Sequence, residues 1–277
     1  MSTAETPVAL VTGAAQGVGL GIARALHESG YRVALADVKD SEAESVAAEL
    51  CQSGPEALAV HLDVTLGADW SKVMDSLIGR WKRLDVLVNN AGISPRGTVE
   101  STDEALWDRT LAVNLKGPWL GIKTALPWLR KSRGSIVNIG STRATRPLPG
   151  MFSYCTSKSG LWGLTQQVAV EYLETGITCN MVAPGWVDTP GERIIQASYG
   201  RPDFPKGTQN ILVPEEIGDA VVFLVSKAGH KVNGVTLYVD SGLHIADDAG
   251  MVYLPGRTRP PYEQIPTGST LPGEPKP

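Results

Sequence analysis

The sequence predicts an α/β domain, a doubly wound parallel sheet of about seven strands with helices on both faces. Short apolar runs alternate with amphipathic helical segments along most of the chain, which is the order expected of strands joined by crossover helices. The runs are apolar at successive positions, so both faces of each strand should be buried. A glycine-rich turn joins the first strand to the first helix, as in many nucleotide-binding sheets.

The composition is that of an ordinary globular protein. Of the 277 residues, 42% are hydrophobic and 19% are charged, which provides ample core for one large domain. The net charge of −4 gives no basic surface for nucleic acid, and no apolar run approaches the ~20 residues that span a bilayer. Three cysteines without a paired spacing argue against a disulfide framework or a zinc site. Because the N-terminus lacks a secretory signal, we expect a cytoplasmic protein.

Each element follows from the pattern of apolar and turn residues. Strands are predicted at residues 7–12, 32–36, 57–62, 84–88, 135–140, 177–182 and 235–240. Helices are predicted at residues 20–29, 41–53, 69–81, 102–130 and 214–226, with another around Tyr154. Pro118 and Pro127 are expected to kink or shorten the helix over residues 102–130. Residues 191–213 are predicted to be a long irregular segment, and loops of that length are often lids.

The turn after the first strand is the first indication of a binding site. Its sequence is Thr12-Gly13-Ala14-Ala15-Gln16-Gly17-Val18-Gly19, and a helix follows. Glycines let the backbone approach a pyrophosphate, while the N–H groups and dipole of the helix face the same anion. The spacing differs from the commoner Gly-x-Gly-x-x-Gly, and a flexible turn is the alternative. The flanking strand and helix favour a nucleotide site.

Asp37 stands at the end of the second strand, about 20 residues past the glycines. A carboxylate there accepts hydrogen bonds from a ribose diol and repels a 2′-phosphate, which predicts NAD over NADP. Lys39 weakens this inference, whereas Gln16 adds no positive charge. The alternative is a turn residue at a strand end. Gly13, Asp63 and Asn90 also follow strands, so all four residues should converge on one crevice.

The pair Tyr154 and Lys158 predicts an acid/base group. Residues four apart on a helix lie on the same face, so the lysine ammonium should sit beside the phenol and favour its ionised form. A free tyrosine has a pKa of about 10, and lowering it by roughly three units takes about 4 kcal/mol. Such a phenolate can accept a proton from an alcohol near neutral pH. Alone, this pair more often marks an exposed helix face.

Several motifs occur together in a fixed order. They are Thr12-Gly13-x-x-x-Gly17-x-Gly19, Asp63, Asn89-Asn90-Ala91-Gly92, Asn114, Ser141, Tyr154-x-x-x-Lys158 and Pro184-Gly185-x-x-x-Thr189. In number, order and spacing this set resembles the short-chain dehydrogenase/reductase family, in its single-domain branch. The resemblance covers residues 7–242. It implies one Rossmann-type catalytic and cofactor-binding domain over residues 1–246, which interconverts a secondary alcohol and its ketone with a nicotinamide cofactor.

The resemblance also implies roles for individual residues. Tyr154 is then the catalytic acid/base, and Ser141 donates a hydrogen bond to the substrate oxygen. Lys158 lowers the pKa of the tyrosine and holds the nicotinamide ribose, and Asn114 positions a water in the proton relay. The cofactor, expected to be NAD, would meet Gly13, Gln16, Gly17, Val18, Gly19, Asp37, Asp63, Val64, Asn90, Ala91, Gly92, Tyr154, Lys158, Pro184, Gly185, Val187 and Thr189. The chemistry requires no metal, and none of the four histidines falls within these motifs.

Five residues are candidates for the substrate pocket: Ser94, Arg96, Arg143, Phe152 and Trp186. Trp186 offers a flat apolar wall for a ring or carbon chain. The arginines either bind a carboxylate or several hydroxyls, or remain solvated. We expect a small secondary alcohol or ketone, such as a polyol, a sugar or a cyclic alcohol.

The C-terminal residues 247–277 are rich in proline and glycine and extend beyond the point where relatives commonly stop. Ser241 also stands where many relatives carry a glycine. The tail is either disordered or an arm on a neighbouring subunit, and we expect the arm. A truncation after Asp248 that leaves oligomer size, stability and kinetics unchanged would exclude it.

Two other functions remain open. One is an NADPH-dependent 3-oxoacyl-type ketoreductase, against which Asp37 argues. The other is an NAD-binding sensor or scaffold without catalysis, against which the set of Ser141, Tyr154 and Lys158 argues. Relatives are often homodimers or homotetramers joined through the helices of Asn114 and Tyr154. Trp162 and Leu164 are therefore interface or core residues.

Overall fold

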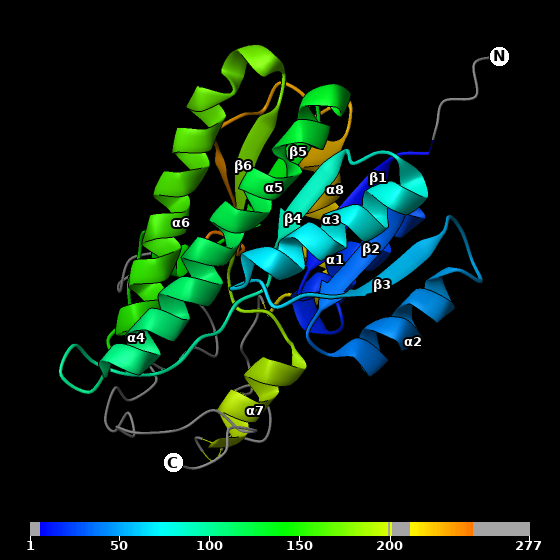
Figure 1. Cartoon of the computed structure of the whole chain (residues 1–277). Coiled ribbons are helices and arrows are strands. Elements are labelled where there is room, and N and C mark those ends of the chain that lie inside the picture. The colour runs from blue at the N-terminus through cyan, green and yellow to red at the C-terminus, as the bar shows by residue number, and fades with distance from the viewer. Residues whose placement is uncertain (1–5, 199, 201–210, 246–277) are drawn as a thin grey trace.

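Seven parallel strands form one sheet in the order β3-β2-β1-β4-β5-β6-β7 in the computed structural model of this protein, which describes residues 6–198, 200 and 211–245 (Figure 1). The strands are β1 (Val8–Thr12), β2 (Arg32–Asp37), β3 (Ala57–His61), β4 (Val86–Asn89), β5 (Ser135–Ile139), β6 (Thr178–Pro184) and β7 (Thr236–Val239). The predicted seven-stranded, doubly wound fold is confirmed. The order reverses between β1 and β4, so the ligand crevice is expected beyond their carboxyl ends.

Helices cover both faces of the sheet (Figure 1). They are α1 (Gly17–Glu28), α2 (Asp40–Leu50), α3 (Gly67–Trp81), α4 (Glu104–Leu111), α5 (Gly117–Ser132), α6 (Phe152–Glu171), α7 (Pro190–Ser198) and α8 (Pro214–Val225). Alternate residues of β1 face different layers. Ala9 and Val11 pack with α1, α2 and α8, whereas Val8 and Leu10 pack with α3 and α5. This alternation explains the uninterrupted apolar runs, because each strand must fill two cores.

The helix predicted over residues 102–130 is three elements. α4 runs into a π-helix, Ala112–Lys116, and then into α5. The predicted shortening of the helix at the prolines is wrong, because α5 includes both prolines and continues to Ser132, whereas the predicted kink stays a prediction. Pro118 lies in the first turn of α5, where its missing N–H costs no helical hydrogen bond, and Pro127 is accommodated within α5. The irregularity lies at the π-helix, which carries Asn114.

The segment predicted to be irregular over residues 191–213 begins with a helix, α7. Thr189 starts it, since its Oγ1 accepts a hydrogen bond from the backbone N–H of Glu192 at 3.1 Å. Arg193 then forms two hydrogen bonds of 2.7 Å with Asp188. Helix α1 similarly begins at Gly17, three residues earlier than predicted.

Residues 201–210 lie outside the described residues, and so does the segment from 246 to 277 that includes the predicted tail. The division of the chain at residue 246 and the subunit arm therefore stay predictions. No helix within the described parts of the chain is long and apolar enough to cross a membrane.

Candidate active site

The glycine-rich turn packs closely between β1, β4 and the start of α1. Gly13 has φ +64°, in the left-handed region that favours glycine, and a Cβ there would lie 2.9 Å from Cα of Ala91. A Cβ at Gly19 would lie 2.0 Å from the carbonyl oxygen of Gly13, so only glycine lets the helix approach the turn. Gly17 has φ +57°, and a Cβ there would lie 3.5 Å from the Cβ of Thr189.

Asn90 and Thr12 hold this turn against the end of β4. The Asn90 side chain donates to the carbonyl oxygens of Thr12 at 2.9 Å and Gly13 at 3.1 Å. In return, the Thr12 hydroxyl accepts the backbone N–H groups of Asn90 at 2.9 Å and Ala91 at 3.0 Å. The glycine-rich turn and the Asn89-Asn90-Ala91-Gly92 motif are therefore hydrogen bonded to each other at the predicted crevice.

Asp37 lies at the end of β2 and is buried, with 8% of its surface exposed. One carboxylate oxygen accepts the backbone N–H of Ala15 in the glycine turn at 3.0 Å, and the other accepts that of Lys39 at 3.0 Å. The Lys39 ammonium does not pair with Asp37, because it donates to Gln16 Oε1 at 3.0 Å. The carboxylate is thus held at the turn by two backbone donors.

The remaining predicted cofactor residues line the same edge of the sheet. Asp63 accepts hydrogen bonds from the backbone and side chain of Thr65, at 2.9 and 2.7 Å. Pro184 ends β6, and the Gly185 backbone N–H donates to Val239 on β7 at 2.8 Å. Val64 and Val187 are buried, whereas Val18 packs against the first core and is partly exposed.

Ser141 and Tyr154 are brought together by the end of β5 and the first turns of α6. Their side chains are hydrogen bonded, which lowers the pKa of Tyr154. Burial acts in the opposite direction and is the larger effect, so the pKa of the phenol is raised overall. The positive charges of Arg96 and Arg143 also act on the phenol and lower its pKa. The expectation of a lowered pKa is therefore wrong for this structure, because burial outweighs the nearby cations.

Lys158 lies one turn along α6, with its Nζ 5.8 Å from the centre of the Tyr154 ring. The Nζ donates to the backbone carbonyl of Ile139 at 2.8 Å. Only 5% of the residue is exposed, and burial lowers the pKa of its ammonium to about 8. A Cβ on Gly92 would lie 3.6 Å from this Nζ, so the glycine keeps the space in front of the lysine open.

Asn114 connects the π-helix to two parts of the site. Its side chain accepts from the backbone N–H of Ile93 at 2.9 Å and donates to the carbonyl of the same residue at 2.8 Å. It also donates to the Ser157 hydroxyl on α6 at 3.0 Å. Because all these contacts lie beside Lys158, Asn114 holds the loop after β4 against the helix that carries the tyrosine.

The substrate candidates lie on four segments: Ser94 and Arg96 follow β4, Arg143 follows β5, Phe152 begins α6 and Trp186 follows β6. Phe152 is 37% exposed and packs against Trp107 of α4, with ring centres 5.4 Å apart. The Trp186 indole N–H donates to Glu192 of α7 at 2.7 Å, so this ring is fixed by the helix that the sequence failed to predict. Arg96 and Arg143 both act electrostatically on Tyr154.

A contact that sequence reasoning missed supports the turn after Ser141. The Tyr238 hydroxyl lies 3.0 Å from the Thr145 hydroxyl, and the Tyr238 ring stacks on His244 at 3.7 Å. His244 is held by Asp240, which is 2% exposed, through its backbone N–H at 2.6 Å and Nδ1 at 2.9 Å. The Asp240 and His244 spacing of four residues was visible in the sequence, but the ring stack depends on how the chain turns after β7.

Two of the histidines, His27 and His61, have packing or surface positions. His27 is buried with Nε2 2.8 Å from the carbonyl of Pro55, and His61 pairs with Asp40 at the surface. Among the described residues, no group of three or more His, Cys, Asp or Glu side chains is arranged to hold a metal ion.

Comparisons with known proteins agree with this geometry. Residues 13–244 match a family model described as enoyl-(acyl carrier protein) reductase. The chain is 37% identical over 249 residues to 2-(S)-hydroxypropyl-CoM dehydrogenase 3 of Xanthobacter autotrophicus, covering 86% of this chain and 97% of that protein. It is 36% identical to trans-4-hydroxycyclohexanecarboxylate dehydrogenase of Sinomonas cyclohexanicum, covering 85% and 92%.

Solved structures give the same result. A crystal structure of levodione reductase superimposes with a TM-score of 0.82 at 30% identity, covering 87% of this chain and 98% of that one. A 3-ketoacyl-(acyl-carrier-protein) reductase from Brucella melitensis, complexed with NADH, superimposes with a TM-score of 0.78 at 30% identity, covering 86% and 98%. The protein is an oxidoreductase that uses a nicotinamide cofactor and interconverts a secondary alcohol and its ketone. The chain belongs to the short-chain dehydrogenase/reductase family.

Proposed function

We propose that this protein is an NAD-dependent dehydrogenase of a small secondary alcohol, with Tyr154 as the acid/base. The observation that carries the proposal is the hydrogen-bonded pair of Ser141 and Tyr154, with buried Lys158 one helical turn away. An alcohol oxygen placed between the Ser141 and Tyr154 hydroxyls would lose its proton to the phenolate while Ser141 donates a hydrogen bond to it. A bound oxidised nicotinamide would supply the acceptor for the hydride that leaves the carbinol carbon.

The residues at the sheet edge fit a dinucleotide. The glycines keep side chains out of the space between the turn and Thr189, and the start of α1 supplies unpaired backbone N–H groups for a pyrophosphate. Asp63 and Val64 would meet the adenine, and Val187 and Thr189 the nicotinamide carboxamide. Asn114 would position a water toward Lys158, because its side chain already lies beside the open space at Gly92.

NAD, rather than NADP, is the cofactor that Asp37 favours. Its carboxylate is held at the glycine turn by two backbone donors, so a 2′-phosphate would meet a fixed negative charge. Lys39 is the cation nearest in sequence, and its ammonium is engaged with Gln16. This arrangement also disfavours an NADPH-dependent 3-oxoacyl reductase, although one structural relative reduces such substrates.

A cyclic or short branched alcohol is the substrate class that the relatives favour. The name of one relative specifies a hydroxylated cyclohexane ring, and another is named for a hydroxypropyl group. The flat ring of Trp186, held by Glu192, would provide a wall for such a substrate. We favour this class over sugars and polyols.

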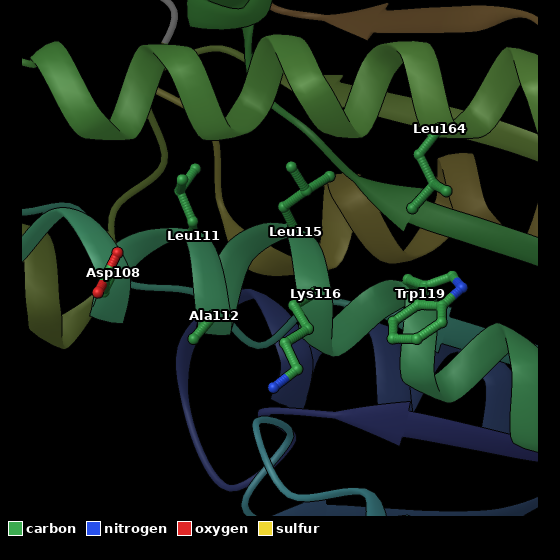
Figure 2. Close-up of a pocket in the computed structure, with 7 residues that line it drawn as sticks. All are labelled: Asp108, Leu111, Ala112, Leu115, Lys116, Trp119 and Leu164. Atoms are coloured by element: carbon green, nitrogen blue, oxygen red, sulfur yellow. The ribbon is translucent and has the colours of Figure 1, made fainter.

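We also infer that the protein forms a homo-oligomer in the cytoplasm. A hollow of about 530 Å³ lies on the outer side of α4, the π-helix, α5 and α6, and is lined mostly by apolar groups (Figure 2). Trp119 beside it is 45% exposed, and Trp162 on α6 is 38% exposed. Exposed apolar surface of this kind usually marks an interface. Light scattering on the purified chain would measure the subunit number.

The decisive experiment is Tyr154→Phe, with Tyr172→Phe at the far end of α6 as the matched control. We expect Tyr154→Phe to lower kcat for NAD-linked oxidation by about 10²- to 10⁴-fold while NAD binding, followed by fluorescence, survives. The control should retain activity. Turnover that persists in Tyr154→Phe would show that the mechanism is wrong.

A further inference from the structure

We propose that the substrate of this site carries a carboxylate, which Arg96 binds with support from Arg143 beside the reacting carbinol. The inference rests on the proposed function and deepens it by naming the substrate class of the same site. Its basis is that two loops carrying arginines meet the site near Tyr154: one bridges to the start of α6 beside Arg96, and the other follows Ser141 and carries Arg143.

The backbone of Arg96 is fixed to the start of the tyrosine helix. Its neighbour Gly97 forms a bridge with Met151, and the Gly97 backbone N–H donates to Gly150 at 2.9 Å. The Phe152 backbone N–H donates back to the Gly97 carbonyl at 3.1 Å. The backbone at Arg96 is therefore held next to the first turn of α6. The contact is made at Phe152, two residues before Tyr154 in the sequence.

The Arg96 side chain is half-buried and lacks an acidic partner within residues 6–198, 200 and 211–245. Its guanidinium donates to the Ser94 hydroxyl at 3.1 Å, which aims one edge of the group and leaves other N–H donors available. A partly desolvated cation is stabilised when an anion completes its hydrogen bonds. A carboxylate matches the planar fork of arginine better than a neutral hydroxyl does.

Arg143 follows Ser141, whose side chain is hydrogen bonded to Tyr154. Its backbone N–H donates to the Ser141 hydroxyl at 3.1 Å, and its guanidinium donates to the Arg146 carbonyl at 3.3 Å. Both Arg96 and Arg143 lower the pKa of Tyr154 through their charge, so both lie within electrostatic reach of the reacting group. This concentration of positive charge occurs in a protein whose net charge is −4.

The carboxylate would orient the substrate without taking part in the reaction. During oxidation the carbinol carbon loses a hydride to the nicotinamide and the hydroxyl loses its proton to Tyr154, while the carboxylate keeps its charge. Its contacts are then equal in the ground and transition states, so they should appear mainly in KM. A bound carboxylate would also offset the arginine charges, so the pH midpoint of turnover should be more alkaline with an acid than with its neutral analogue.

The test compares a matched pair of substrates, 4-hydroxycyclohexanecarboxylate and its carboxamide, in four variants. Arg96→Gln removes the charge, Arg96→Lys keeps the charge without the fork, and Arg143→Gln removes the second cation. Arg24→Gln is the control, since Arg24 pairs with Glu49 across α1 and α2. We expect Arg96→Gln to lower kcat/KM for the acid by about 10- to 100-fold, mostly through KM, and for the amide by less than 3-fold. Equal losses for acid and amide would overturn the proposal.

A binding measurement separates this proposal from the proposed function. Calorimetry would compare cyclohexanecarboxylate with cyclohexanecarboxamide on the NADH complex of the wild type and of each variant. Tighter binding of the carboxylate, lost in Arg96→Gln, supports the anion subsite even if no alcohol is turned over. Equal binding of the two ligands to the wild type overturns it, even if neutral alcohols are oxidised and the proposed function stands.

Discussion

The buried ammonium of Lys158 should make the stability of this protein depend on alkaline pH. Burial lowers the pKa of Lys158 from 10.5 to about 8, while the residue is only 5% exposed. Each pKa unit corresponds to about 1.4 kcal/mol, so keeping this lysine charged in the folded state costs about 3 kcal/mol near pH 7. The cost is fully present below pH 8 and disappears as the pH rises towards 10.5, because the unfolded state binds the proton more tightly.

Lys158→Met is the perturbation that isolates this effect. Methionine is unbranched and apolar, so it fills much of the same space without a charge. It also leaves the Ile139 carbonyl without its 2.8 Å hydrogen bond, a loss of about 1–3 kcal/mol that does not depend on pH. At pH 7 the free energy of unfolding of the variant should therefore exceed that of the wild type by about 0–2 kcal/mol.

Urea unfolding, followed by circular dichroism at fixed protein concentration, would compare the two proteins at pH 7 and pH 9.5. The wild type should gain about 2 kcal/mol relative to Lys158→Met over this interval. Titrations of other groups occur in both proteins and cancel in the difference. A difference between wild type and variant that does not change with pH would refute the assignment of a penalised, buried ammonium.

Three further perturbations test other parts of the site. Asp37→Ala should shift the ratio of kcat/KM for NAD over that for NADP towards NADP by about 10- to 100-fold, and an unchanged ratio would show that this carboxylate does not select the cofactor. Gly19→Ala should lose about 1–3 kcal/mol of unfolding free energy, because its Cβ would meet a carbonyl oxygen at 2.0 Å. The control Gly79→Ala lies in α3, where the new Cβ would meet no atom within 4 Å outside the adjacent helix backbone, so it should gain about 0.5–1 kcal/mol; equal effects of the two substitutions in thermal melts would contradict the packing. Tyr238→Phe removes the hydroxyl contact with Thr145, so it should lower kcat several-fold with a stability loss of about 1 kcal/mol; unchanged kinetics would show that this contact does not support the turn after Ser141.

Much of the fold could be predicted because local patterns and tertiary burial agree along β1, β2 and β4. Their successive apolar residues are needed to fill two cores, and no other arrangement buries both faces. The predictions failed where a local signal competed with tertiary contacts. Pro127 is tolerated inside α5, and helix α7 is capped by Thr189, which precedes it, and held by the Asp188–Arg193 pair.

The sequence by itself determined the chemistry that is available at the site. The sequence shows the glycine turn, Ser141, Tyr154 and Lys158 directly. The chemistry requires these residue types, and the geometry of a turn or a helix fixes their spacing along the chain. The tertiary structure decided the electrostatics, since the raised pKa of Tyr154 and the lowered pKa of Lys158 come from burial by other segments. It also placed the loop that carries Arg96 beside the start of α6, through a bridge between Gly97 and Met151, which are more than fifty residues apart in the sequence. Burial and contact between distant segments depend on how the whole chain packs, and no local pattern records them.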